Sequence, residues 1–381
     1  MTTPHVLISG GGIAGTALGV ALGRRGIAAT VLERASGPRA GGHTVDLRGH
    51  SQQVLRDWGL LDAVLALRVA EERMVAVGRD GREWWRMPAQ AGGIVADVEI
   101  GREDLNRVLA EASTAEVHYG EQLAEVELGA DGVRAETSRG RRIEADFLVL
   151  AEGTRSASRQ RFFPAAGSRY LGGYLAFVAV PYPAEFGDEM RMFGVGGGVM
   201  AAIRPGRLGG QALVAIRTPP RPELASDVAA QRRFVAESVE RAGIAGEWHL
   251  PAVLDAVAHD PGFHCDALTS VDAPVWSSGR AVLLGDSAWS GSPLTGLGTA
   301  MAIMGAEALA AVVSEGDLGQ YETRMRRFER WAHRDAAPAT LRRWAPASAG
   351  AARRNAAMMR IFTGSPLRRL LTRAERLPAW V

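Results

Sequence analysis

Residues 5–34 place an apolar strand, a glycine-rich turn, a helix and a second apolar strand in direct succession. The β-branched run at 5–9 predicts a buried strand, and the Ala/Leu-rich, proline-free run at 16–26 predicts a helix. A second strand is predicted at 28–32, ending at Glu33. A strand–helix–strand unit of this kind predicts an α/β fold.

The turn glycines follow the spacing G-x-G-x-x-G, with Gly10, Gly12 and Gly15 at its three positions. The first allows a tight turn, the second lets a pyrophosphate approach the backbone, and the third lets the helix pack closely on the strand. The helix N-terminus offers N–H groups and partial positive charge to phosphates. Glu33 stands 18 residues after Gly15, near the distance expected of a ribose-binding carboxylate. Such glycines also occur in plain turns, but this context predicts a dinucleotide site, with FAD and NAD both open.

Composition limits the class of protein. The 381 residues allow two or three domains, and 47% hydrophobic with 23% charged residues is typical of a globular protein. The net charge of +2 is too small to indicate a nucleic-acid partner.

One cysteine, Cys265, excludes an intrachain disulfide and a cysteine-based metal site, so we expect no metal and a cytoplasmic location. A strand beginning at His5 leaves no room for a signal peptide, and the apolar stretch 300–313 is too short to span a membrane.

Apolar strands far apart in the sequence predict one doubly wound parallel sheet, because such strands need both faces covered. They lie at 5–9, 28–32, 146–150 and 280–284. The strand-rich block 170–270 is inserted between the last two. We therefore predict a discontinuous Rossmann-like α/β domain (1–72, 99–168 and 275–317), a β-rich domain (73–98 and 169–274) and C-terminal helices (318–381).

Local patterns add elements to this framework. Helical spacing predicts helices at 51–58, 100–112, 224–243 and 250–260, and one beginning near Gly298. Alternation predicts hairpin strands within 73–98 and three short strands between 117 and 142. The GVGGG run at 194–198 predicts a hairpin turn.

Four segments together resemble the group A FAD-dependent aromatic hydroxylases, the p-hydroxybenzoate hydroxylase family. They are GGGIAG with Glu33, IGREDL at 100–105, AEGTRS at 151–156 and GDSAWSGSPLTGLG at 285–298. The phrase GGHTVDLRGHSQQVLRDWGLL at 41–61 is similar to the tetracycline-inactivating monooxygenases of that family. The resemblance covers most of 5–320 and is poor in 170–270, where the substrate would be selected.

This resemblance implies an FAD-dependent monooxygenase with NAD(P)H and O2 as co-substrates. NAD(P)H would reduce the flavin, and O2 would form a flavin C4a-hydroperoxide that hydroxylates an aromatic or polyketide-like small molecule. No separate NAD(P)H domain is expected, and no residue stands out as the substrate's base. We expect a monomer or weak dimer, without nucleic acid or a membrane span.

The family's cofactor contacts transfer to individual positions. Glu33 would hold the adenosine ribose, Arg102 would reach the pyrophosphate or ribityl chain, and Asp286 would accept a hydrogen bond from a ribityl hydroxyl. Asp46 would lie near the same cofactor. The remaining FAD-binding positions implied by the resemblance are Gly10, Gly12, Ile13, Ala14, Gly15, Arg34 and Leu123.

The loop after residue 284 would lie against the isoalloxazine ring through Pro293, Gly296, Leu297 and Gly298. Glycines let the backbone approach a flat ring. A helix N-terminus near Gly298 would face the pyrimidine and favour the anionic reduced flavin. An ordinary strand–loop–helix with turn glycines is the alternative.

Two positions depart from the family pattern. Glu152 stands where the family has the aspartate of Ala-Asp-Gly, which bears on FAD geometry or NAD(P)H docking. Trp289 stands where the family often has histidine. Tryptophan is no acid or base near neutral pH, so we expect Trp289 to wall the substrate pocket, with core filling as the alternative.

Other polar residues have two interpretations each. Arg39 and Arg48 either attract NAD(P)H phosphates or are solvated loop residues. His43 and His50 either relay protons or are surface and core groups, and lone histidines favour the second interpretation. His264, although next to a cysteine, completes no metal site.

Aromatic and apolar groups outside these motifs are assigned to packing. Trp84 and Trp85 are expected to pack the hairpin rather than stack a substrate. The arginine-rich segment after 318 is expected to bury an apolar stripe rather than meet a membrane or nucleic acid. That stripe comprises Leu367, Leu370, Leu371 and Leu377.

Two other functions stay open. One is a flavoprotein that does not oxygenate, such as a dehydrogenase or a cyclase. A flavin-dependent halogenase is disfavoured, because the W-x-W-x-I-P motif is absent. The other is a non-catalytic nucleotide-binding protein, which isolation without flavin would indicate.

Overall fold

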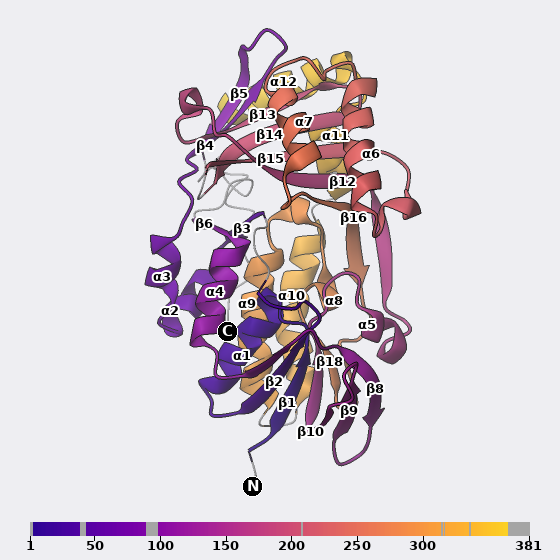
Figure 1. Cartoon of the computed structure of the whole chain (residues 1–381). Coiled ribbons are helices and arrows are strands. Elements are labelled where there is room, and N and C mark those ends of the chain that lie inside the picture. Colours follow the sequence, from indigo (N-terminus) through magenta and orange to yellow (C-terminus); the bar gives the residue numbers. More distant parts are fainter. Residues whose placement is uncertain are drawn as a thin grey trace.

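The computed structural model describes residues 3–38, 43–88, 98–206, 209–313, 315, 317–334 and 337–364. Two large sheets organise these residues, one toward each end of the molecule, with helices packed on both (Figure 1). The chain passes between the two ends several times, so each is built from segments far apart in the sequence.

The first sheet is six-stranded, in the order β17-β18-β11-β1-β2-β7. All neighbouring pairs are parallel except β17 with β18. Its strands are β1 (His5–Ser9), β2 (Ala28–Glu33), β7 (Glu116–Tyr119), β11 (Phe147–Leu150), β17 (Ser277–Ser278) and β18 (Ala281–Leu283). The parallel sheet predicted from the four apolar runs is therefore confirmed.

The helices beside this sheet pack closely on one another. Helix α1 (Ile13–Gly23) contacts both α4 (Arg102–Ala112) and α9 (Gly298–Val313). Gly19 and Gly23 make this possible, because a Cβ at either would lie within 2.5 Å of a side-chain oxygen after α4. The remaining helices at this end are α2 (His50–Asp57), α3 (Leu61–Ala66), α5 (Ala157–Phe162), α8 (Asp286–Trp289) and α10 (Leu318–Arg334).

A small antiparallel sheet shares this core. It consists of β8 (Leu123–Leu128), β9 (Val133–Thr137) and β10 (Arg142–Ala145). Val126 and Val133 belong to the same buried cluster as the parallel strands. Where three short strands are predicted between 117 and 142, the structure has four between 116 and 145. The first of them, β7, pairs with β2 and belongs to the parallel sheet.

The helix predicted at 100–112 begins two residues later. Ile100 and Gly101 extend β6 (Val98–Gly101), which pairs with β3 (Thr44–Leu47). Pairing with a partner distant in sequence overrides the local helical spacing there. The helix predicted at 16–26 instead begins at Ile13, directly after the glycine turn.

The second sheet is seven-stranded, in the order β16-β12-β15-β14-β13-β4-β5. The predicted hairpins are confirmed by the antiparallel pair β4–β5 and by the turn at 197–198 between β13 and β14. The strands are β4 (Arg73–Val77), β5 (Glu83–Pro88), β12 (Gly167–Val180), β13 (Glu189–Gly196), β14 (Val199–Gly206), β15 (Gly209–Arg217) and β16 (His264–Asp272).

The two faces of this sheet carry different helices. Helices α6 (Val228–Arg241) and α7 (Leu250–His259) share a buried cluster with one face. Helix α11 (Ala337–Trp344) packs on the other face, and α12 (Ala349–Gly364) lies over β5 and β13. The leucine stripe predicted at 367–377 lies outside the described residues. The exact domain boundaries stay predictions.

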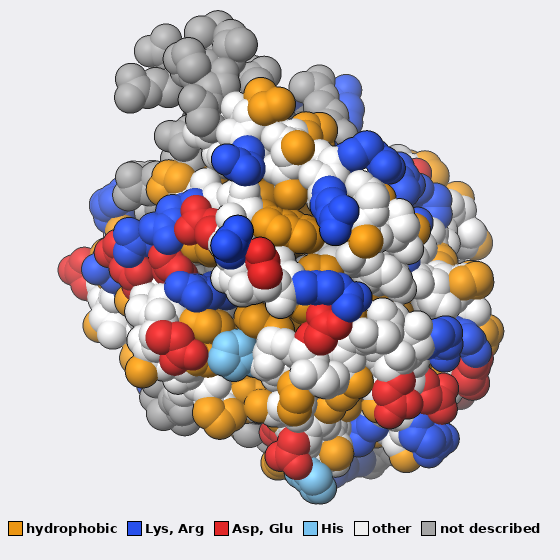
Figure 2. Space-filling view, turned by 90° about the horizontal axis from the view of Figure 1, so that it is seen from above, with side chains coloured by type: hydrophobic (Ala, Val, Ile, Leu, Met, Phe, Trp, Pro, Cys, Tyr) orange, Lys and Arg blue, Asp and Glu red, His pale blue; other side chains and the backbone are white. Residues whose placement is uncertain are grey.

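The molecular surface agrees with the small net charge. Viewed from the end that carries the seven-stranded sheet, arginines and acidic residues are interspersed with apolar groups (Figure 2). Among the described residues, no helix combines the length and apolarity required to cross a bilayer.

Candidate functional site

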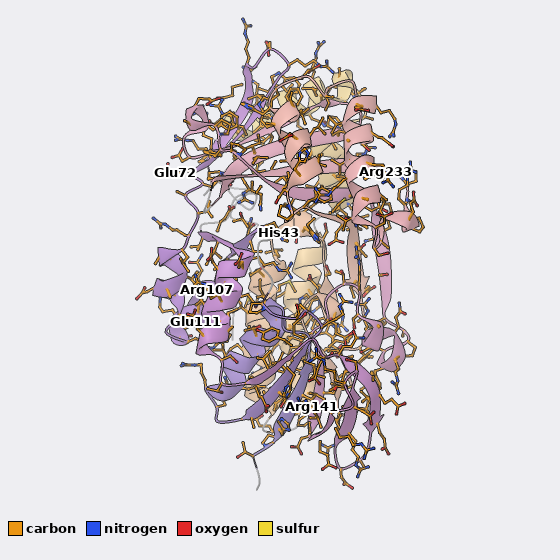
Figure 3. The ribbon with its side chains drawn as sticks, viewed as in Figure 1. His43, Glu72, Arg107, Glu111, Arg141 and Arg233 are labelled. Atoms are coloured by element: carbon orange, nitrogen blue, oxygen red, sulfur yellow. The ribbon has the colours of Figure 1, made fainter. Side chains whose placement is uncertain are left out.

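A cavity of about 2130 Å³ lies between the two large sheets and is lined by residues of both. A pocket for one drug-sized ligand measures about 300–1,000 Å³, so this cavity has room for a dinucleotide and a second small molecule. Ser9, Leu32 and Ala151, at or just after the carboxyl ends of parallel strands, line it. Ligands bind at that edge of open α/β sheets. Figure 3 shows His43 between the two ends of the molecule.

The turn from β1 to α1 requires glycine for the predicted reasons. Gly10 has a φ of 111°, and a Cβ there would lie 2.4 Å from the carbonyl oxygen of Ala151. A Cβ at Gly15 would lie 1.9 Å from the Gly10 carbonyl oxygen, so this glycine permits the close helix–strand approach. At Gly12 a Cβ would meet no heavy atom of the described residues within 4 Å beyond its neighbours, and no side chain caps α1. The start of α1 therefore presents its N–H groups to the cavity.

Glu33 is fixed beside this turn. Its carboxylate accepts hydrogen bonds of 2.8 Å from the backbone N–H groups of Gly11 and Ala35. Arg34 and Leu123 line the same cavity, as do the helix residues Ile13 and Ala14. The predicted cofactor positions at the start of the chain thus converge, except for Gly15, which is buried behind the turn.

The Asp286 carboxylate faces the cavity from the start of α8. Burial raises the pKa of Asp286, whereas the charge of Arg102 and a hydrogen bond with Ser290 oppose that rise. Arg102 begins α4, and its backbone N–H donates to the His43 carbonyl at 3.2 Å. A carboxylate can accept several hydrogen bonds, so Asp286 retains acceptor capacity for a ligand hydroxyl.

The loop before α9 adopts the predicted turn. Pro293 opens a short 3₁₀ turn, Gly296 has a φ of 63°, and α9 begins at Gly298. Asp46 and Arg48 form an ion pair of 2.7 Å, with 14% and 13% of their side chains exposed. A Cβ at Gly296 would lie 2.3 Å from the Asp46 carboxylate, so the pair packs directly against this loop. The interpretation of Arg48 as a solvated loop residue is therefore wrong.

Glu152 is held by three serines. Its carboxylate accepts hydrogen bonds of 2.6 Å from the Ser9 hydroxyl and 2.7 Å from each of the Ser156 and Ser158 hydroxyls. The backbone N–H of Ser158 adds a bond of 3.2 Å. The extra methylene relative to aspartate thus serves a network of this chain's own side chains at the cavity wall.

The expectation that Trp289 walls the substrate pocket is wrong. Trp289 is only 1% exposed and does not line the cavity. Its ring lies 4.6 Å from that of Trp276 and 6.0 Å from that of Tyr321. It packs over Gly305 of α9, where a Cβ would lie 2.8 Å from the indole. The glycine gap in α9 accommodates the indole, so Trp289 is a core residue.

Other singled-out residues lie away from the cavity. The His50 ring meets Phe328 edge-on at 6.0 Å. Trp84 and Trp85 pack against the clusters on opposite faces of the seven-stranded sheet, as expected for a hairpin. Arg39 lies outside the described residues.

Sequence reasoning missed the wall that the second sheet contributes. Strands β12 and β16 pair Leu175 with Asp266 and Phe177 with His264, and all four residues line the cavity. The intervening Cys265 is buried on the opposite side, where burial raises the pKa of its thiol to about 12. Alternation along β16 was the available signal, but sequence alone does not fix which face points inward.

His43 completes this wall. Its ring stacks on Phe177 with centroids 4.5 Å apart and an interplanar angle of 19°. Burial, with the nearby charges of Arg102, His264 and Arg204, lowers the pKa of His43 to about 3. The imidazole therefore stays neutral near pH 7 and cannot relay protons as a base there.

A buried ion cluster also lines the cavity. Arg204 donates from Nε to Glu71 at 2.9 Å and pairs through another nitrogen with Glu99. All three are at most 9% exposed. Burial raises the pKa of Glu71, whereas Arg204 opposes the rise. The members come from distant segments, so the sequence offered no spacing by which to find them.

Comparisons with known proteins agree with this geometry. Residues 3–181 match the model of the FAD binding domain. An uncharacterised protein of Mycobacterium tuberculosis is 32% identical over 313 residues, covering 80% of this chain and 83% of its own. The FAD-dependent monooxygenase asL4 of Sarocladium schorii is 30% identical over 341 residues, covering 83% of this chain and 77% of its own. The chain therefore belongs to the family of FAD-dependent monooxygenases, which are oxidoreductases.

Solved structures share the fold. Tetracycline destructase Tet(51) aligns with a TM-score of 0.81 at 20% identity, over 100% of both chains. HpxO of Klebsiella pneumoniae, complexed with FAD and uric acid, aligns with a TM-score of 0.76 at 21% identity, over 98% of this chain and 96% of its own. At these identities the likeness establishes the fold, and the family resemblance seen in the sequence is confirmed.

Proposed function

We propose that this chain binds FAD and uses NAD(P)H and O2 to hydroxylate an aromatic or polyketide-like small molecule. The supporting observation is that residues from distant segments, each matched to a cofactor-binding position of the family, line one cavity with room for a second molecule. They are Gly10, Gly12, Ile13, Ala14, Glu33, Arg34, Asp46, Arg102, Leu123, Asp286, Pro293, Gly296, Leu297 and Gly298.

The residues present fit the cofactor. The open space at Gly12 and the uncapped start of α1 would receive the pyrophosphate, and Glu33 would hold the ribose. Asp286 and Arg102 would contact the ribityl chain and phosphates. When bound, FAD supplies the redox and oxygen chemistry that amino-acid side chains lack.

The rest of the cavity would position the substrate. The α9 N-terminus at Gly298 would stabilise negative charge on the flavin pyrimidine. The Asp46–Arg48 ion pair would hold the preceding loop in place. Leu175, Phe177 and Met190 give an apolar wall that would hold an aromatic ring and exclude water. We also propose a cytoplasmic location, where NAD(P)H is available, and a monomer or weak dimer.

The experiment is Asp286→Ala, compared with Asp131→Ala in an exposed turn of the small sheet. FAD-to-protein ratio, thermal midpoint and NADPH consumption in air are measured for both. We expect Asp286→Ala to purify with much less FAD and Asp131→Ala to match the parent. Full retention of FAD and activity in Asp286→Ala would contradict the proposed site.

Product mass then separates the proposed reaction from other flavin chemistry. A product heavier by one oxygen atom supports hydroxylation. Turnover without that gain would indicate a dehydrogenase or cyclase, and a protein that neither carries nor takes up flavin would indicate a non-catalytic binding protein.

A further inference from the structure

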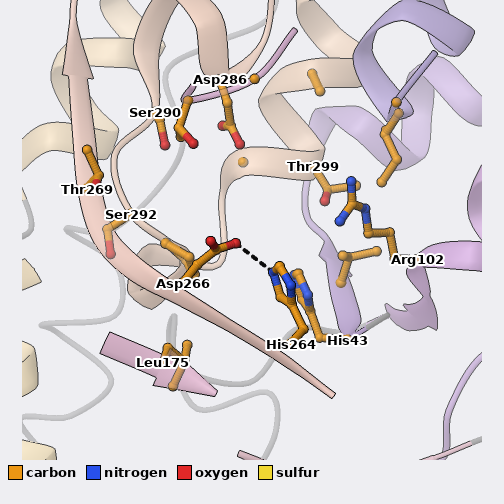
Figure 4. Close-up of a pocket in the computed structure, with 18 of the residues that line it drawn as sticks. His43, Arg102, Leu175, His264, Asp266, Thr269, Asp286, Ser290, Ser292 and Thr299 are labelled. Carbon is orange, nitrogen blue, oxygen red and sulfur yellow. Dashed lines mark ion pairs between the residues drawn. The ribbon is translucent and has the colours of Figure 1, made fainter. Parts of the chain in front are cut away.

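His264 and Asp266 form a pair that the sequence did not reveal. Nε2 of His264 lies 2.6 Å from an Asp266 carboxylate oxygen. Alternation along β16 turns both side chains into the cavity, whereas Cys265 between them is buried on the other face. Figure 4 shows this pair beside His43, between the Asp286 end of the pocket and Leu175.

The carboxylate of the pair is held from its other side. Arg155 pairs with Asp266 and also donates to the Ala225 carbonyl at 3.1 Å. Although burial raises the pKa of Asp266, the His264 hydrogen bond and the charges of Arg155 and Arg102 bring it below its usual value. Asp266 therefore stays ionised and orients the imidazole with Nε2–H toward itself. The other ring nitrogen, Nδ1, makes no hydrogen bond to any described residue and can accept a proton.

Several charged and titratable groups surround His264. The charged and titratable groups near His264 are Asp266 beside it, Arg155 behind Asp266, Arg102 at the start of α4, and His43 with Arg204 beyond it. Because the pKa of His43 is about 3, His43 is no competing base near neutral pH. Arg155 is paired with Asp266, and Arg204 is paired with Glu71 and Glu99. The charge of Arg102 would help to stabilise a negative oxygen on a ring next to Phe177.

We propose that His264, oriented by Asp266, accepts the proton of a phenolic or enolic hydroxyl of the substrate. This inference rests on the proposed function and narrows its substrate class to compounds with an acidic hydroxyl. The substrate O–H bond breaks, its electron pair stays on oxygen, and an N–H bond forms at Nδ1. The Nε2–H bond to Asp266 is kept throughout. The resulting anion delocalises negative charge onto a ring carbon, which makes that carbon a better nucleophile toward electrophilic oxygen.

The test uses FAD-loaded protein and 4-nitrophenol, a phenol whose anion absorbs visible light. The pH midpoint of its ionisation is measured free and bound to the parent, to His264→Gln and to Asp266→Asn. The matched control is His259→Gln, which removes a histidine paired at 3.2 Å with Asp255 on the surface of α7. Flavin content and the rate of flavin reduction by NADPH are recorded for every variant.

We expect the parent and His259→Gln to lower the midpoint of bound 4-nitrophenol by about one pH unit or more, a tenfold change in ionisation. His264→Gln should lose most of this shift, and Asp266→Asn should lose part of it. His259→Gln should match the parent in flavin content and reduction, and the flavin content of each cavity variant shows whether its cofactor site is intact. Asp266→Asn keeps the test decisive should His264→Gln not fold.

Two results would overturn the inference while leaving the proposed function intact. One is an equal midpoint shift in the parent and both cavity variants. The other is a flavin-loaded, NADPH-reducible parent that does not bind 4-nitrophenol at millimolar concentration. A parent without flavin would instead refute the proposed function, and this inference with it.

Discussion

The Ser9 hydroxyl donates a hydrogen bond of 2.6 Å to the Glu152 carboxylate, joining the carboxyl ends of the neighbouring strands β1 and β11. The same carboxylate accepts bonds from Ser156 and Ser158, so it connects the glycine turn to the start of α5. The glutamate that departs from the family pattern is therefore part of a complete local network.

Shortening this side chain should break the network. Glu152→Asp cannot reach all three serines, and each buried group left without a partner costs about 1–3 kcal/mol. We expect a lower free energy of unfolding and weaker FAD retention, measured by urea denaturation and by the FAD-to-protein ratio. Glu144→Asp, at a side chain 85% exposed on β10, is the control. A Glu152→Asp protein as stable as the control would disprove the structural role of the network.

The two glycines of the turn should respond differently to alanine. Gly10→Ala should prevent folding, because its Cβ would overlap the Ala151 carbonyl at a φ of 111°. Gly12→Ala should fold normally, because its backbone φ of −75° suits alanine, yet its methyl group enters the cavity. Soluble yield, circular dichroism and FAD affinity measure this contrast. Equal FAD affinity in Gly12→Ala and the parent would contradict the placement of the pyrophosphate.

Trp289 should affect stability rather than substrate binding. Trp289→Ala removes a fully buried side chain packed on Trp276 and Gly305, which costs about 3–5 kcal/mol of unfolding free energy. Chemical denaturation measures the loss. The KM of the folded fraction should stay near that of the parent, and a large KM increase at unchanged stability would restore Trp289 to the pocket wall.

The buried ion cluster should be sensitive to loss of its one cation. Arg204→Met leaves Glu71 and Glu99 buried without a counter-charge, which costs about 3–5 kcal/mol. Arg142→Met removes an ion pair with Glu136 whose side chains are 88% and 43% exposed, and should cost about 1 kcal/mol or less. Denaturation of both variants at pH 7 checks the difference, and equal losses would count against a buried cluster.

His43 should make stability depend on acid. Its folded pKa of about 3 lies below the ordinary value of 6.5, so the unfolded chain takes up a proton that the folded chain refuses. Stability is therefore retained above pH 6.5 and falls as the pH drops from 6.5 toward 3, by about 1.4 kcal/mol per pH unit at the steepest. His43→Phe, which retains a ring against Phe177, should reduce this slope, whereas His259→Gln should not. Urea midpoints across this window measure it, and parallel slopes would refute the burial of His43.

The sequence by itself determined four strands of the first sheet and the glycine turn. The apolar runs at 5–9, 28–32, 146–150 and 280–284 have few alternatives to a buried parallel sheet. The spacing of Gly10, Gly12 and Gly15 is a local requirement of one turn, so it can be recognised without coordinates.

Only the tertiary structure decided which side chains face one another. Trp289 was assigned to the pocket because sequence position does not show that Gly305 of α9 leaves a gap for its ring. The sequence alone does not assign His264 and Asp266 to the cavity, because a one-residue change of register would turn both side chains away from it. Backbone elements follow from local pattern and burial, whereas a site assembled from several segments depends on packing between residues far apart in the chain.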